Sequence, residues 1–203
     1  MYNKLDTNFI IDTNRGKNMN WYKISQSIIG QQYQKMLDEA SANVSITGAG
    51  SNQTIQIPGT STTIAIRDVL ETVKRQILPI LQEKHVTEIN TDPISNPQAQ
   101  GLAHSHRPGV IQLDINKILN SAKGAMPPNI QTDGTTIDTD IIDTIVERVK
   151  NYIQSEILET AAHESQHVFD YSEAYKNKQP FTSITEAPAE QFGQQIRQRY
   201  QNR

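Results

Sequence analysis

Apolar residues recur at steps of three and four between residues 140 and 171, and this spacing predicts one long amphipathic helix. The apolar positions of this stretch are Ile141, Ile142, Ile145, Val146, Val149, Ile153, Ile157, Leu158, Ala161 and Ala162. Asp138 or Asp140 could cap the N-terminus, where a carboxylate also suits the positive end of the helix dipole. A helix of this length is unusual in a globular protein, so a break near Asn151 is a second interpretation.

Helical spacing of apolar residues also predicts amphipathic helices over residues 21–42 and 67–84, the second with a kink at Pro79. Farther along the chain, Thr185 is a suitable N-cap for another helix. Pro188 would then lie in the first turn, where its missing N–H breaks no hydrogen bond within the helix.

Strand patterns are short and lie between the predicted helices. Alternation within residues 43–66 predicts a β-hairpin that turns around Gly48, and residues 85–89 alternate like a short strand. The clearest strand covers residues 109–115. The segment 92–108 contains three prolines and is therefore expected to be a loop.

This mixture of helices and a small sheet indicates an α+β fold. We divide the chain into a polar tail (1–19), an N-terminal region of helix and hairpin (20–84) and a core (85–203). Residues 121–139, which precede the long helix, form a stretch long enough to be a flap over a cleft or a propeptide-like cover.

The long helix carries the pattern His-Glu-x-x-His at His163, Glu164 and His167. Residues four apart lie on one face of a helix, so the two imidazoles can bind one Zn²⁺ at roughly 2.0–2.1 Å. Glu164 follows the first histidine by about 100° of rotation and borders the metal, where a general base is needed. The alternative is a helix whose histidines only pack or face solvent.

A hydrolytic zinc site usually has three protein ligands and one position for water. Glu186 and Glu190 lie four apart on the next predicted helix, so one could bind the metal while the other holds a histidine N–H. A second arrangement would use Asp170 or Glu173, three and six residues after His167. That arrangement needs a glycine at position 170 for an unusual turn, and an aspartate serves it poorly. Asp170 could instead orient one of the histidines.

The two helices resemble the active site of gluzincins, which are zinc metallopeptidases with HExxH followed by a downstream Glu-x-x-x-Asp/Glu helix. Residues 163–171 look like the active helix of thermolysin-like and anthrax-lethal-factor-like enzymes. Residues 186–192 are similar to a run in the lethal-factor type, and the pair also resembles compact phage-repressor-cleaving metallopeptidases. The resemblance implies that Glu186 is the third ligand and that Glu190 supports a ligand.

The resemblance further implies a minimal zincin-like fold, in which a small sheet with an exposed edge strand packs on the active helix. In such enzymes an extended substrate lies along the edge strand and bonds to its main chain. The strand before the long helix is our candidate for this edge, and its residues are Val110, Ile111, Gln112 and Leu113.

Gln179 stands where these enzymes often have a tyrosine or histidine that stabilises the oxyanion, seven residues before the third ligand. Tyr171 and Tyr175 are therefore candidates for that role by proximity alone. His104 and His106 could bind a second metal or contact substrate, although a solvated loop is the simpler interpretation.

The composition of the chain argues against some classes of partner and of metal ligand. The 203 residues have a formal net charge of −3, which argues against a nucleic acid or an anionic membrane as partner. The chain contains no cysteine, so disulfides and thiolate zinc ligands are excluded. No apolar run approaches the roughly 20 residues of a membrane span, and the absence of a secretory signal predicts a cytoplasmic location.

These observations predict a zinc-dependent endopeptidase that acts on a protein or peptide. One alternative is a binding or structural module that keeps the zincin fold but does not cleave. Another is a self-processing enzyme encoded by a phage or virus, with which the Asn-, Gln- and Ile-rich composition is compatible. The cleavage specificity and the oligomeric state are left open by the sequence.

Overall fold

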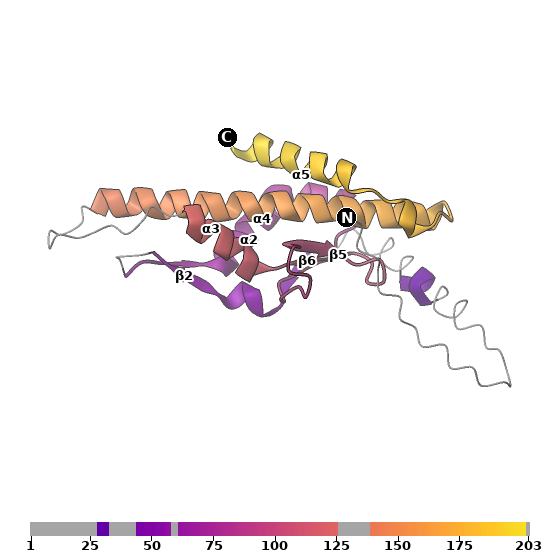
Figure 1. Cartoon of the computed structure of the whole chain (residues 1–203), viewed down its shortest axis with the longest axis horizontal. Helices are drawn as coiled ribbons and strands as arrows, with labels where there is room; N and C mark the ends of the chain where they lie inside the picture. The colour runs from indigo at the N-terminus through magenta and orange to yellow at the C-terminus, as the bar shows by residue number, and fades with distance from the viewer. Residues whose placement is uncertain (1–27, 33–43, 58–60, 126–138, 202–203) are drawn as a thin grey trace.

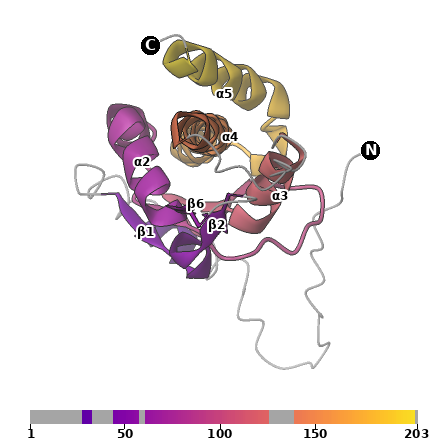
Figure 2. The same cartoon turned by 90° about the vertical axis from the view of Figure 1, so that its left-hand side faces the viewer.

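The long helix predicted from the sequence is the centre of the fold. The structure is a computed structural model that describes residues 28–32, 44–57, 61–125 and 139–201. Helix α4 (Thr139–Lys176) runs through the molecule, with a four-stranded sheet on one side and helix α5 (Glu186–Gln201) on the other (Figures 1 and 2). The fold is α+β, as expected.

Helix α4 has 38 residues and is therefore about 57 Å long at 1.5 Å per residue. It is unbroken at Asn151 and extends five residues past the predicted end at Tyr171. The length and continuity of α4 follow from its apolar stripe. The stripe is buried along most of the helix, and packing on both sides stabilises the helix. The buried apolar residues are Val149, Ile153, Ile157, Leu158, Ala161, Ala162, Val168 and Ala174.

The sheet has the strand order β1-β4-β6-β5. Its strands are β1 (Ser45–Thr47), β4 (Glu88–Asn90), β6 (Val110–Leu113) and β5 (Gly101–Ala103). Strand β4 pairs parallel with β1 and β6, whereas β5 pairs antiparallel with β6. The register aligns Ile46, Ile89, Ile111 and Ala103 in one row across the sheet, and all four are buried. This row is part of the core on the face that α4 covers.

The predicted edge strand is wrong. Strand β6 lies between β4 and β5, so the edge of the sheet beside the HExxH segment is β5, within the segment predicted to be a loop. The residues of β6 are mostly buried and nearly all apolar, which is typical of an interior strand. Strand β4 begins at Glu88, three residues later than predicted.

The predicted hairpin around Gly48 is also wrong. The chain does turn at this point: Gly48 adopts a positive φ of 88° and is followed by the short helix η1 (Ala49–Asn52). However, the turn leads from β1 in the main sheet to β2 (Thr54–Gln56), which pairs antiparallel with β3 (Thr63–Ala65) in a sheet of its own. Hydrogen bonds from Gly50 and Ser51 to Thr91 hold the turn against the end of β4.

The remaining helices of the described chain pack against α4. Helix α2 (Ile66–Glu83) confirms the prediction over 67–84 and contains Pro79. Helix α3 (Ile115–Ala125) was not predicted and follows β6 directly. A short helix η2 (Phe181–Ser183) precedes α5. Because β1 and α2 belong to the same core as the later elements, the described residues form one folded unit.

Some predictions lie outside the described residues. Within the helix predicted over residues 21–42, only 28–32 are described, and they are helical. The segment 126–138, which is most of the predicted flap, is not described. Among the described helices, none combines the length and the apolar character needed to cross a membrane.

Candidate metal centre

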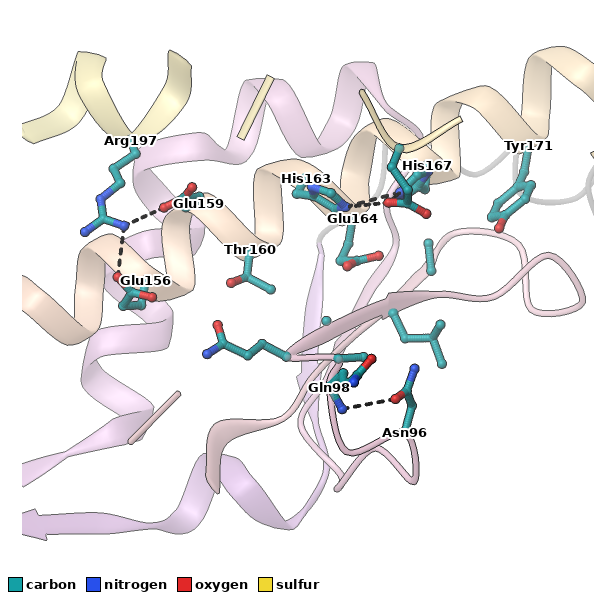
Figure 3. Close-up of a pocket in the computed structure, with 16 residues that line it drawn as sticks. Asn96, Gln98, Glu156, Glu159, Thr160, His163, Glu164, His167, Tyr171 and Arg197 are labelled. Carbon is teal, nitrogen blue, oxygen red and sulfur yellow. Dashed lines mark hydrogen bonds and ion pairs between the residues drawn. The ribbon is translucent and has the colours of Figure 1, made fainter. Parts of the chain in front are cut away.

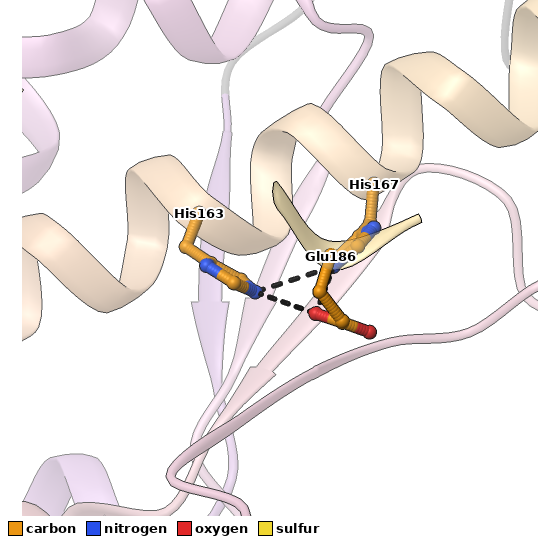
Figure 4. Close-up of side chains that lie close together, drawn as sticks. All are labelled: His163, His167 and Glu186. Atoms are coloured by element: carbon orange, nitrogen blue, oxygen red, sulfur yellow. Dashed lines mark hydrogen bonds and ion pairs between the residues drawn. The ribbon is translucent and has the colours of Figure 1, made fainter. Parts of the chain in front are cut away.

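Two helices bring the predicted ligands together. His163 and His167 lie one turn apart on α4, and Glu186 is the first residue of α5 (Figure 4). The Nε2 atoms of the histidines are 3.2 Å apart. Glu186 Oε2 lies 3.3 Å from Nε2 of His163 and 3.0 Å from Nε2 of His167. Among the described residues, this trio is the group whose geometry suits a metal ion.

The turn between α4 and α5 explains how a glutamate nineteen residues after His167 reaches the site. Lys178 has a left-handed φ of 54°. The N–H of Lys178 donates to the carbonyl of Tyr175, and the N–H of Gln179 donates to that of Ala174. This is the Schellman pattern that ends a helix, and it reverses the chain so that α5 packs back along α4. Gln179 thus belongs to the helix cap.

The donor atoms fit a zinc ion. Bonds of 2.0–2.1 Å at tetrahedral angles separate ligand atoms by about 3.3–3.4 Å, and the three observed separations are 3.0–3.3 Å. Burial lowers the pKa of His163, as does His167, so the neutral imidazole that binds metals is favoured. The side chain of Glu186 is 79% exposed, and its carboxylate contacts both imidazoles from the solvent side.

Glu164 lies under the edge strand and is 6% exposed. Burial raises its pKa to about 8, the negative charge of Glu186 adds to this, and a hydrogen bond from the Ala103 backbone opposes it. A carboxyl group with a pKa near neutrality suits general acid–base chemistry. The HExxH segment therefore has its two histidines on one side and a buried carboxyl group facing β5.

A cleft of about 660 Å³ runs along α4 past these residues. Figure 3 shows Tyr171 beyond His167 at one end, and Glu156, Glu159 and Arg197 at the other. Arg197 of α5 forms ion pairs with both of those glutamates. The opposite wall of the cleft comes from β5 and the loop before it. The cleft thus gives access to the metal ligands and to Glu164 together.

The structure separates the two tyrosine candidates. Tyr171 lines the cleft, and its ring centroid lies 6.3 Å from that of His167 and 5.3 Å from that of Phe181. Burial and the charge of Glu164 raise the pKa of Tyr171, so its hydroxyl keeps its proton and remains a donor. Tyr175 lies against Gly30 in the helical segment 28–32, and it is not among the residues that line the cleft.

The residues expected to orient the ligands make other contacts in the described chain. Asp170 accepts a hydrogen bond from Gln166, and the exposed Glu190 accepts one from Gln194. His167 Nδ1 is buried and has no partner among the described residues, so neither carboxylate holds this ring. Asp170 therefore does not hold His167, and its described hydrogen bond is the one from Gln166. For Glu190 the described contacts with the histidines amount to an electrostatic effect on His163.

The alternative ligand Glu173 also lies elsewhere. Its carboxylate pairs with Lys176 Nζ at 2.7 Å, one turn along α4. Helix α4 continues past this position to Lys176, so the tight turn that would bring Glu173 or Asp170 to the metal does not form. Of the candidate third ligands, Glu186 is the one that contacts both histidines.

His104 and His106 stack edge-to-face with ring centroids 5.1 Å apart. His104 Nε2 lies 2.8 Å from Gln112 Oε1, and burial lowers the pKa of His106. They belong to no group of potential metal ligands among the described residues.

Sequence reasoning missed two sets of residues at the site. Gly101 and Ala103 of β5 lie against Glu164, and no sequence pattern distinguished this three-residue strand from a loop. Glu156, Glu159 and Arg197 line one end of the cleft. The three-residue step from Glu156 to Glu159 places both carboxylates on the helical face that reaches His163 one turn later, which was a signal available in the sequence.

No family model, curated protein or solved structure matches this chain. Function is therefore argued from the geometry and chemistry of the site itself.

Proposed function

We propose that this protein is a zinc-dependent endopeptidase. The observation that carries the proposal is the convergence of three donor atoms, from His163, His167 and Glu186, beside the buried carboxyl group of Glu164. An exposed carboxylate is common on any protein surface. Here the carboxylate lies within 3.3 Å of two imidazole nitrogens, in a cleft that also reaches a buried acid. A hydrolytic zinc site needs this combination of groups.

His163, His167 and Glu186 would hold the ion. When bound, Zn²⁺ would lower the pKa of a water molecule to about 7 and polarise the scissile carbonyl group. Glu164 acts as the general base: it takes a proton from the attacking water and gives it to the nitrogen of the leaving amine. Its carboxyl group is largely buried beneath β5 and accepts a hydrogen bond from the Ala103 backbone, and Glu164 also lines the cleft.

Strand β5 takes the role in substrate binding that the sequence had suggested for 110–113. One side of β5 pairs with β6, and the other side, which pairs with no strand among the described residues, lines the cleft. An extended peptide bound to that edge through its main chain would pass the metal ligands with little dependence on its side chains. Tyr171 is the proposed oxyanion donor, because its protonated hydroxyl belongs to the same cleft.

Metal content and one conservative variant test the proposal. Protein purified in zinc-supplemented medium should retain one Zn²⁺ per chain, and His163→Ala or His167→Ala should abolish retention. Glu164→Gln should keep the metal but lose hydrolysis of casein or of a mixed peptide library by about 10²–10⁴-fold. Glu147→Gln is a matched control, because Glu147 lies on the exposed face of α4 far from the site.

Three outcomes would contradict different parts of the proposal: the metal, the activity and the role of Glu164. Wild-type protein that retains less than about a tenth of an equivalent of zinc would overturn the metal assignment, given the strong binding of structural and catalytic zinc sites. Zinc-loaded protein that cleaves neither casein, nor the peptide library, nor itself would instead favour a binding module with the same fold. Unchanged hydrolysis by Glu164→Gln would exclude Glu164 as the base.

A further inference from the structure

Two glycines lie against the HExxH turn of α4 from opposite sides. Gly193 belongs to α5, which carries Glu186, and Gly101 belongs to β5, which covers Glu164. Figure 2 shows α4 between α5 and the sheet to which β5 belongs. Neither glycine is required by its φ angle, since neither has a positive φ. Their lack of a side chain therefore calls for another explanation.

Gly193 lets α5 approach α4 closely beside a metal ligand. A Cβ atom at this position would lie 2.9 Å from the backbone oxygen of Glu159 and 3.2 Å from Cβ of His163. Both atoms are rigid parts of α4, so a methyl group could be accommodated only if α5 moved away. The neighbours Ala189 and Ile196 are also buried against α4, and the whole helix would share the displacement. Glu186 lies on this helix, two turns before Gly193.

Gly101 lets β5 approach α4 closely beside Glu164, the proposed base. A Cβ atom here would lie 2.6 Å from Oε1 and 2.7 Å from Cγ of Glu164, and 2.6 Å from Cγ2 of Thr160. A methyl group would have to displace the carboxyl group of Glu164 or the strand itself. Displacing the strand would also alter the hydrogen bond that the Ala103 backbone makes to Glu164. The three heavy atoms nearest to this methyl group thus belong to Glu164 and Thr160 and not to a metal ligand.

We propose that Gly193 and Gly101 are separate positioning residues: Gly193 places the third ligand, and Gly101 places the general base. The inference rests on the proposed function, because it concerns the same site. It goes further by dividing the site into two parts that can be disturbed one at a time. Metal binding depends on the contact between α4 and α5, and proton transfer depends on the contact between α4 and β5.

Two substitutions that each add one methyl group test the inference. One should change the Kd for zinc and the other should change kcat. Gly193→Ala should raise the Kd for zinc about 10–100-fold, the loss typical when the support of a ligand is disturbed. Gly101→Ala should leave the Kd for zinc unchanged but lower kcat on a casein-derived fluorescent peptide by about a hundredfold, as displacement of a reacting group by 1 Å can do. Gln195→Ala, an exposed position on α5, should change neither quantity.

Helix propensity gives Gly193→Ala a second readout. Alanine is a better helix former than glycine, so without the close contact this variant would raise the melting temperature of the zinc-free protein. With the close contact, the melting temperature should fall or stay level. Zinc affinity is measured by competition with a chelator, and the helical circular dichroism of each zinc-free variant is compared with that of the wild type.

Three results would overturn the inference. The first is Gly193→Ala that binds zinc like the wild type and melts at a higher temperature. The second is Gly101→Ala that weakens zinc binding as much as it slows turnover. The third is loss of the helical signal in either variant, because the inference confines both effects to the site. Failure of the proposed function appears differently, as wild-type protein that retains no zinc.

Discussion

Replacing Asp114 with asparagine should destabilise the wall of the cleft, and the size of the effect follows from the partners of this carboxylate. Asp114 is 3% exposed and lies between β6 and α3. It accepts hydrogen bonds from the backbone N–H groups of Ile94 at 3.0 Å and Lys117 at 3.2 Å, and it pairs with Lys117 Nζ at 3.1 Å. It therefore caps α3 and anchors the loop that starts at Ile94.

Lys117 extends this anchor toward the cleft. Its Nζ also donates to the backbone oxygens of Ile94, Asn96 and Ala99, and the last two residues line the cleft. In Asp114→Asn the amide can still accept the capping bond, but the ion pair is lost and an NH₂ group faces one of the two donors. Hydrogen bonds to charged groups contribute about 1.5–3 kcal/mol, and Lys117 keeps its carbonyl partners, so we expect a loss of about 2–3 kcal/mol.

Burial alone would raise the pKa of Asp114, but its hydrogen bonds from Ile94 and Lys117 outweigh this and hold the pKa below its usual range. A carboxyl group whose pKa is lower in the folded state stabilises the fold above the unfolded pKa of about 3.9 and loses that contribution as the pH falls through the folded value. The difference in unfolding free energy between wild type and Asp114→Asn should therefore be constant near neutral pH and shrink below about pH 4.

Urea unfolding followed by circular dichroism measures the loss of unfolding free energy and its dependence on pH. In thermal unfolding, the melting temperature of a chain of this length should fall by about 4–12 °C. The control is Asp143→Asn at an exposed position of α4, where a change within about 0.5 kcal/mol is expected. The reasoning would be refuted if Asp114→Asn were as stable as this control, or if the difference from wild type persisted undiminished to pH 2.

Two further predictions concern the metal centre. In a chelator titration, Glu186→Ala should weaken zinc binding by more than the 10–100-fold typical of an outer contact, whereas Glu190→Ala should weaken it slightly and Glu173→Ala not at all. If Glu173→Ala caused the largest loss, the ligand assignment would be wrong. Tyr171→Phe should keep zinc and lower kcat on a cleavable peptide by about 10²–10³-fold, as for other oxyanion donors, and Tyr175→Phe should leave kcat unchanged. Equal kcat values for the two tyrosine variants would remove Tyr171 from that role.

The helices could be predicted because their signals are local. The apolar stripe from Ile141 to Ala162 repeats over about six turns of α4, and each repeat falls within one window of sequence. The same holds for α2, whose buried residues follow helical spacing despite Pro79. Helix α3 was missed because its first residue, Ile115, continues the alternating pattern of β6, so the change of period was hidden by an isoleucine that suits both.

The sheet could not be predicted in the same way, because pairing is not local. Strand β1 pairs with β4, forty-three residues later, and it is separated from β2 by a glycine turn that resembles a hairpin turn. Every strand of this sheet has only three or four residues, too few for alternation to be distinguished from chance. An interior position for β6 was indicated by its three apolar residues out of four, more than a half-exposed edge strand needs.

The candidate site depends on both kinds of information. The spacing of His163, Glu164 and His167 is local and gives the orientation of two candidate ligands and the proposed base on one helix. That spacing also occurs by chance, and what distinguishes this copy is the burial of Glu164 beneath β5. In the sequence, Gly101 resembles a loop residue. In the fold, its missing side chain lets an edge strand approach the base within van der Waals distance. The residue that makes the pattern chemically distinctive is therefore one that carries no local signal, because its role appears only when strand and helix meet.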